Sequence, residues 1–261
     1  MEFLGNVLPA DILLEDLVAS LNIISTGCSP LDEILGRGLY SGEITEIFGL
    51  SGVGKSQFCL SIATHVADEL AKNVLYVDTG TGFNSERIYE ILSKKHNDTN
   101  VINLKKCMTR IQCVKTFEIF HAFILLDQIK KQLSCEENSF YKDVVLLVFD
   151  SVDNIVSPVL GGFGHGLMIQ FAHSLKGLAY DHNVAVLVTN SVILDTKTKD
   201  YTRPALGVSW ERIPHNRIFL KHCTMQKKQE NSGFRWIKLV KSCRMPLKES
   251  VVVSISELGL H

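Results

Sequence analysis

Residues 49–56 read Gly-Leu-Ser-Gly-Val-Gly-Lys-Ser and match the pattern G-x-x-x-x-G-K-[ST] at every fixed position. Its glycines let backbone N–H groups approach phosphates that a side chain would keep away. Lys55 can place a positive charge on the β- and γ-phosphates, and the Ser56 hydroxyl can ligate Mg²⁺. Residues 43–48 are rich in Ile, Phe and Thr, and residues 57–71 carry apolar side chains at helical spacing. The motif therefore has the strand before it and the helix after it that a phosphate-binding loop needs, which argues against a chance glycine-rich turn.

A second nucleotide-binding element is predicted where residues 144–151 read Val-Val-Leu-Leu-Val-Phe-Asp-Ser. A buried strand that ends in an acid is what the metal-organising motif of a phosphate-loop protein requires. Asp150 would lie at the carboxyl end of the sheet and orient Mg²⁺, through water, beside Ser56. The alternative is a plain strand followed by an Asx turn. The predicted nucleotide-binding residues of the loop are Gly49, Leu50, Ser51, Gly52, Val53, Gly54, Lys55 and Ser56.

The bulk properties exclude several classes of protein. The 261 residues are 46% hydrophobic and 21% charged, which is ordinary for one large or two small globular domains. A net charge of −1 gives no overall attraction to nucleic acid, so any such contact must come from local patches. No run of 18 apolar residues predicts a membrane span, and no secretory signal is visible. Seven cysteines without a C-x-x-C pair indicate reduced thiols inside the cell rather than a disulfide framework or a zinc site.

From residue 42 onward, strand-like and helix-like segments alternate, which predicts a mostly parallel α/β sheet covered on both faces. The expected strands are 44–48, 74–78, 111–114, 144–150 and 185–190, and the expected helices are 57–71, 85–92, 119–133 and 167–180. Three further strand-like stretches without helices between them, 217–222, 235–242 and 250–255, predict an antiparallel extension of the sheet. We expect one core domain over residues 23–261. Residues 1–22 form a leader whose apolar residues fit either a partner-docking helix or a helix packed on the body.

Several stretches outside the loop carry a family likeness: residues 25–32 (STGCSPLD), 39–46 (LYSGEITE), 57–60 (QFCL), 73–78 (NVLYVD), 85–88 (SERI), 151–162 (SVDNIVSPVLGG) and 203–210 (RPALGVSW). In this combination they resemble the RecA-like recombinases of the eukaryotic and archaeal branch. The likeness covers about residues 10–258 and is strongest to the D-type group of the eukaryotic recombinase paralogues. It implies a RecA-like P-loop ATPase core with a mostly parallel twisted sheet.

The resemblance also implies a function. Members bind ATP with Mg²⁺, bind single-stranded or branched DNA, and act in homologous-recombination repair in the nucleus, together with sister paralogues that include a C-type paralogue and a smaller partner. Arg87 resembles the family residue that packs on adenine, although a salt-bridge partner on a helix surface would look the same. The alternatives to an ATP-binding paralogue are a competent DNA-dependent ATPase or strand-exchange recombinase, and an interaction subunit with a structural nucleotide.

The chain departs from the family pattern in three places. Active members carry a glutamate in Asp-Thr-Glu-Gly-Thr-Phe that activates the attacking water, whereas this sequence has Gly80 there and only Asp78 nearby. Because glycine cannot accept a proton, we expect at most slow hydrolysis, with nucleotide binding retained and no assigned catalytic residue. Ser191 replaces a glutamine that couples the γ-phosphate to a DNA-binding loop, and serine is too short for the same reach. The sequence before residue 23 shows no counterpart of the family's amino-terminal helical domain or of its F-x-x-A motif, so we expect no long homopolymer; a truncated isoform or gene model is the alternative explanation.

Two segments correspond to the family's DNA-facing loops, at about residues 157–166 and 191–203. The first is rich in glycine and has no Lys or Arg, so a plain mobile loop is an equal alternative. The second contains Lys197, Lys199, Tyr201 and Arg203. Positive charges beside an aromatic ring suit single-stranded DNA, through phosphate neutralisation and base stacking. A solvated surface loop remains the alternative.

Overall fold

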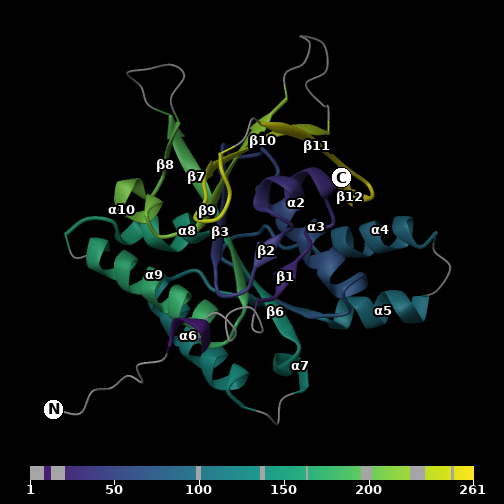
Figure 1. The fold of residues 1–261 in the computed structure, drawn as a ribbon, viewed down its shortest axis with the longest axis horizontal. Helices are drawn as coiled ribbons and strands as arrows, with labels where there is room; N and C mark the ends of the chain where they lie inside the picture. The colour runs from purple at the N-terminus through teal and green to yellow at the C-terminus, as the bar shows by residue number, and fades with distance from the viewer. Residues whose placement is uncertain are drawn as a thin grey trace.

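The structure, a computed structural model, describes residues 9–12, 21–97, 101–135, 139–162, 164–194, 202–223, 233–247 and 250–261. One large sheet runs through the middle of the molecule, and helices cover both of its faces (Figure 1). Most of the predicted leader, residues 1–22, lies outside the described residues. Among the described helices, none combines the length and the apolar character that crossing a membrane requires.

The strands of the large sheet lie in the order β12-β11-β10-β9-β3-β7-β6-β4-β5, and β8 pairs with β7 at one end. Their bounds are β3 (Ile44–Gly49), β4 (Asn73–Asp78), β5 (Ile111–Lys115), β6 (Val144–Asp150), β7 (Ala185–Leu194), β8 (Thr202–Pro204), β9 (Asn216–His222), β10 (Phe234–Lys241), β11 (Val251–Ser256) and β12 (Gly259–Leu260). A separate small sheet pairs β1 (Ile23–Ile24) with β2 (Leu39–Tyr40). The α/β architecture predicted from the sequence is confirmed, including every strand expected between residues 44 and 190.

The antiparallel extension begins one strand later than the sequence predicts. β9 was expected to be its first strand, but β9 pairs in parallel with β3, Thr45 lying opposite Asn216 and Gly49 opposite Leu220. Only its other edge is antiparallel, where it pairs with β10. The prediction for residues 217–222 is therefore wrong at the edge that pairs with β3. Whether a pairing is parallel or antiparallel depends on which strand lies alongside, and the local sequence does not contain that information.

The helices divide between the two faces of the sheet (Figure 1). One face is covered by α2 (Ser29–Leu35), α3 (Lys55–Asp68), α4 (Ser85–Lys95) and α5 (Val101–Thr109), and the other by α6 (Ile119–Leu133), α8 (Val152–Val156), α9 (Gly164–Asp181) and α10 (Gly207–Glu211). Shorter pieces are α7 (Ser139–Lys142) and the 3₁₀ turn η1 (Ser157–Val159). Helix α5 was not predicted, because only Leu104 and Cys107 along it are buried and its remaining described side chains give a weak apolar pattern.

Parallel pairing brings the carboxyl ends of four strands to one edge of the sheet. In the β3–β7 pair Gly49 lies opposite Ser191, and in the β4–β6 pair Asp78 lies opposite Asp150. Since β7 also pairs with β6, these ends form one continuous row. Ligands of open α/β sheets bind at this edge, so the fold places the phosphate loop and the second acidic element side by side.

Candidate nucleotide-binding site

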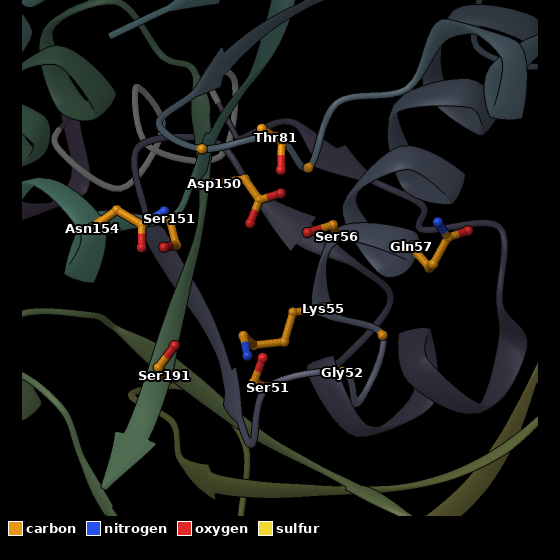
Figure 2. A pocket seen from close by; sticks show the side chains of 13 residues that line it. Ser51, Gly52, Lys55, Ser56, Gln57, Thr81, Asp150, Ser151, Asn154 and Ser191 are labelled. Carbon is orange, nitrogen blue, oxygen red and sulfur yellow. The ribbon is translucent and has the colours of Figure 1, made fainter. Parts of the chain in front are cut away.

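A cavity of about 470 Å³ opens at the carboxyl edge of the sheet (Figure 2). Its lining comes from the loop after β3 with the start of α3, the loop after β4, the end of β6 with the start of α8, and β7. The lining residues are Ser51, Gly52, Gly54, Lys55, Ser56, Gln57, Gly80, Thr81, Gly82, Asp150, Ser151, Asn154 and Ser191. Such a volume lies within the range that small-molecule ligands occupy in proteins.

The phosphate loop ends where α3 begins. Gly54 precedes the first helical residue, Lys55, and has φ +104°, a conformation that L side chains rarely adopt. The Lys55 Nζ donates to the carbonyl oxygens of Gly49 at 2.9 Å and Leu50 at 3.0 Å. Burial lowers the pKa of the Lys55 ammonium from its ordinary value, and the charges of Asp153 and Asp150 oppose that shift. A polyphosphate would add negative charge beside this half-buried cation at the positive end of a helix.

The residues around Ser56 and Asp150 fit a divalent cation. A side chain at Gly82 would put its Cβ 2.6 Å from Asp150 Oδ2 and 2.8 Å from Ser56 Oγ, so both oxygens lie close to one point that no side chain fills. The Tyr76 hydroxyl donates to Asp150 Oδ2 at 2.8 Å, and the Thr189 hydroxyl donates to Asp150 Oδ1. Carboxylate and hydroxyl oxygens are ligands that Mg²⁺ prefers, directly or through water. Asp150 is thus held in place by two buried neighbours, and its role as the metal-organising acid stays a prediction.

Gly80 lines the cavity, and no carboxylate stands in its place. Asp78 is fully buried, and its carboxylate accepts the backbone N–H groups of Gly80 at 3.0 Å, Gly82 at 3.2 Å and Phe83 at 3.4 Å. These bonds shape the loop after β4. Asp78 therefore holds the backbone of this loop through hydrogen bonds, and it is not among the residues that line the cavity in the described part of the chain.

Three of the predicted loop residues, Gly49, Leu50 and Val53, are not among the residues that line the cavity. Gly49 ends β3, where a Cβ would lie 2.3 Å from the carbonyl oxygen of Leu220. Val53 is buried in the core below the loop, and the Leu50 side chain is partly exposed. These residues contribute backbone to the loop, whereas Ser51, Gly52, Gly54, Lys55 and Ser56 reach the cavity.

Arg87 lies on α4 and is not among the residues that line the cavity in the described part of the chain. Its guanidinium donates to Gln57 Oε1 at 3.0 Å, to Glu90 Oε2 at 3.1 Å and to the carbonyl oxygen of Ser256. The pair with Glu90 on the same helix is the salt bridge that the alternative interpretation of Arg87 expects. The bonds to Gln57 and Ser256 also connect α3, which follows the phosphate loop, to β11. Through Gln57, which does line the cavity, Arg87 is connected to the site.

The predicted DNA-contacting residues fall mostly outside the described residues: Lys197, Lys199 and Tyr201 do so completely. Arg203 is described through its backbone in β8, where it lies opposite Ile193 of β7. The other segment, residues 157–166, is only partly a loop, because η1 occupies its start and α9 begins at Gly164. That helical end was not expected from the glycine-rich sequence.

Sequence reasoning did not assign five of the lining residues: Gln57, Thr81, Gly82, Ser151 and Asn154. Gln57 directly follows Ser56, and Ser151 directly follows Asp150, so their position next to a motif residue could have indicated that they line the site. Gly82 and Asn154 gave no signal of their own, because their closeness to the site depends on how the loop after β4 and the start of α8 meet.

Comparison with known proteins places these features in a family context. The Rad51 family model matches residues 18–261. The chain is 39% identical to the DNA repair protein RAD51 homolog 4 of Bos taurus, over 95% of this chain and 75% of the bovine protein. It is 24% identical to the probable DNA repair protein RAD51 homolog 4 of Dictyostelium discoideum, over 88% of this chain and 74% of that protein. The DNA repair and recombination protein RadA of the archaeon Methanoculleus marisnigri is 27% identical over 88% of this chain and 72% of its own length.

Proposed function

The chain belongs to the Rad51 family, and we infer that it is a recombinase paralogue of homologous-recombination DNA repair that holds ATP and Mg²⁺ and hydrolyses ATP slowly. The resemblance to the D-type group is confirmed by the similarity to RAD51 homolog 4. One observation carries the proposal for the site. The cavity brings Lys55, Ser56 and Asp150 together, yet presents Gly80 where a carboxylate would be needed for fast turnover.

Each residue has a role in this proposal. Lys55 and the backbone N–H groups of the loop bind the phosphates, and Ser56 and Asp150 hold Mg²⁺. When bound, Mg²⁺ neutralises phosphate charge and fixes the orientation of the nucleotide. Gly80 offers no atom that could accept a proton from water, and Asp78 is occupied by its own loop. Binding is therefore retained while the step that needs a base is slow.

The turnover number tests this proposal. General-base help contributes about 10²–10⁴-fold and a median enzyme turns over at about 10 s⁻¹, so we expect roughly 10⁻³–10⁻¹ s⁻¹. The chain should be assayed alone and with single-stranded DNA, with Lys55→Ala as the control that removes binding. A turnover near 10 s⁻¹ that Lys55→Ala abolishes would show that another residue supplies the base.

We propose that DNA contact comes from Lys197, Lys199, Tyr201 and Arg203, and that single-stranded or branched DNA is the ligand. Replacing Lys197 and Lys199 by alanine should reduce the slope of log Kd against log salt by about 1.4, because each phosphate contact in single-stranded DNA contributes about 0.7. Tyr201→Ala should weaken binding by roughly 5- to 150-fold at fixed salt, because base stacking is worth about 1–3 kcal/mol. Fluorescence anisotropy measures both effects. No detectable binding by the native chain at low salt, with or without ATP, would refute the DNA proposal.

We also propose that the chain works in the nucleus with sister paralogues, including a C-type paralogue and a smaller partner, and does not form a long homopolymer. The similarity to a RAD51 homolog 3 of Dictyostelium discoideum, 29% identical over 96% of this chain, supports a set of related subunits. Residues 1–22 are proposed as the leader and residues 23–261 as the core. A pull-down with candidate sister paralogues, with and without ATP and Mg²⁺, tests partner choice. If no paralogue is retained in either condition, the assembly proposal fails.

A further inference from the structure

The C-terminal strands pack directly against the phosphate loop. A Cβ at Gly54 would lie 2.8 Å from Ile255 Cδ1 on β11 and 3.7 Å from Arg235 Nε on β10. Arg235 belongs to no nucleotide-binding motif and lies 182 positions from Val53 along the chain, yet its Nε donates to the Val53 carbonyl oxygen at 2.7 Å. The Arg235 guanidinium therefore contacts the backbone of the phosphate loop from the side of β10.

This hydrogen bond constrains the peptide unit between Val53 and Gly54. A trans peptide is planar, and its C=O and N–H point in opposite directions. Because Arg235 holds the Val53 oxygen on the side of β10, the Gly54 N–H is directed to the other side, and Gly54 lines the cavity. Backbone N–H groups of this loop are the groups that cradle phosphates.

We propose that Arg235 is a positioning residue of the nucleotide site, which fixes the Val53–Gly54 peptide with its N–H facing the phosphates. Ile255 lies on the same side of the loop, since a Cβ at Gly54 would come within 2.8 Å of its Cδ1 methyl group. The Arg235 Nη1 donates to the carbonyl oxygen of Phe234 at 2.9 Å, which anchors the guanidinium to its own strand.

The guanidinium also adds charge to the site. Burial lowers the pKa of Arg235 from its ordinary value, yet arginine is protonated at neutral pH throughout proteins. A partly buried positive charge behind Gly54 reinforces the positive end of α3, which begins at the next residue. Both contributions act on phosphates and neither acts on the base or the sugar.

The test rests on the proposed ATP binding and compares variants of the full chain. Arg235→Gln removes the charge, Arg235→Lys keeps the charge and one donor, and Lys238→Gln removes a charge from an exposed position on the same strand. Titration with a fluorescent ATP analogue and with its ADP counterpart gives the dissociation constants, and adenosine is tested as a competitor that lacks phosphates. Thermal melting without nucleotide shows whether each variant is folded.

We expect Arg235→Gln to raise the dissociation constants of the ATP and ADP analogues roughly tenfold, equivalent to about 1.4 kcal/mol. Competition by adenosine should be unchanged. Arg235→Lys should recover most of the loss, and Lys238→Gln should bind like the native chain. If Arg235→Gln lowers the melting temperature but keeps native affinity for the ATP analogue, Arg235 only stabilises the fold and the proposal is wrong. Equal weakening of adenosine would also overturn it. If the native chain itself does not bind the ATP analogue, the proposed ATP binding fails, and this proposal fails with it.

Discussion

Asn154 borders the space that a side chain at position 80 would need. A Cβ at Gly80 would lie 3.0 Å from Asn154 Nδ2, which also donates to the Thr79 hydroxyl at 3.3 Å. The sequence alone predicted the missing carboxylate, because position 80 is read directly from a motif. It did not predict Asn154, since α8 and the loop after β4 meet only in the fold. At the residue scale, a side chain introduced at position 80 must therefore be considered together with Asn154.

Introducing the carboxylate should raise ATP turnover. We expect Gly80→Glu combined with Asn154→Ala to increase kcat by on the order of 10²-fold, because a base is supplied and the amide beside it is removed. Gly80→Glu alone should give a smaller increase, since the exposed Asn154 side chain must first move aside. Gly80→Gln with Asn154→Ala is the matched control without a carboxylate. Steady-state phosphate release measures all three, and equal rates for the Glu and Gln variants would contradict the prediction.

At the scale of elements, one buried carboxylate joins strands of the sheet to a distant helix. Glu46 on β3 accepts hydrogen bonds from Asn190 on β7 and Trp210 on α10, each at 2.8 Å, and pairs with Arg217 on β9. The side chains of Glu46 and Arg217 are 0% and 2% exposed. The sequence predicted β3, β7 and β9 from their composition. It did not predict their adjacency, which depends on pairings between residues more than 140 positions apart.

Breaking this ion pair should be costly. Glu46→Gln leaves Arg217 buried without its fully buried anionic partner, so we expect a loss of about 3–5 kcal/mol in the free energy of unfolding. Arg217 also pairs with Glu211 at 2.8 Å, but that carboxylate is 48% exposed. Glu211→Gln should therefore cost less than about 1 kcal/mol. Urea denaturation measures both, and similar losses for the two variants would contradict the argument.

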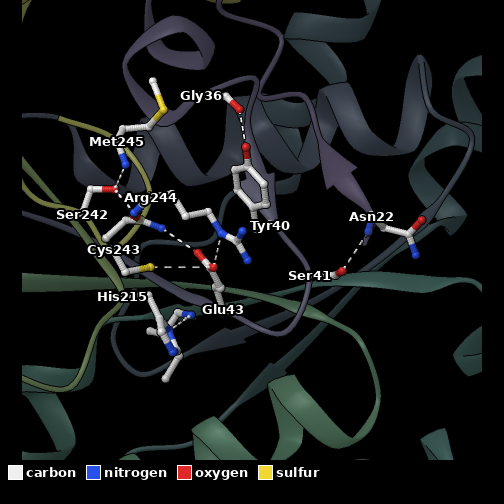
Figure 3. Close-up of polar contacts among 12 residues, drawn as sticks. Asn22, Gly36, Tyr40, Ser41, Glu43, His215, Ser242, Cys243, Arg244 and Met245 are labelled. Carbon is white, nitrogen blue, oxygen red and sulfur yellow. Dashed lines mark hydrogen bonds and ion pairs between the residues drawn. The ribbon is translucent and has the colours of Figure 1, made fainter. Parts of the chain in front are cut away.

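A histidine connects the opposite, amino-terminal end of β3 to the chain that leads into β9 (Figure 3). His215 Nδ1 accepts the backbone N–H of Ile44 at 2.8 Å, which only an unprotonated nitrogen can do. Burial lowers the pKa of His215 from its ordinary value; Glu43 opposes this shift, while Lys176, Lys241 and Arg244 add to it. The neutral ring is therefore the form that holds these two elements together.

Acid should weaken this connection. Since the folded-state pKa of His215 lies below that of the unfolded chain, near 6.5, the unfolded chain takes up the proton first as the pH falls. Stability is therefore lost as the pH falls below about 6.5. His215→Asn keeps an acceptor near the Ile44 N–H but does not titrate. Comparing urea midpoints at about pH 7.5 and about pH 5.5, we expect a smaller drop for the variant, whereas an equal drop would assign the acid sensitivity to other groups.

At the scale of the whole molecule, the candidate site is assembled from segments spread over most of the chain. Lys55 begins α3, Asp150 ends β6, and Ser191 lies on β7. The sequence predicted the phosphate loop because strand, glycines and helix are contiguous there. The remaining lining, including Gly82 beside Ser56 and Asp150, depends on the order of strands in the sheet, which no local pattern contains. Binding at this site must therefore stabilise the fold as a whole.

Nucleotide should consequently raise the melting temperature of the chain. Mg²⁺ and ATP at about 100 times the dissociation constant add about 2.7 kcal/mol to the native state. For a domain of this size, that corresponds to a shift of roughly 5–10 °C. Lys55→Ala should remove the shift because the phosphates lose their cation, and chelating Mg²⁺ should reduce it because Ser56 and Asp150 then act without the metal. Differential scanning fluorimetry measures each case, and a native-sized shift in Lys55→Ala would place nucleotide binding outside this cavity.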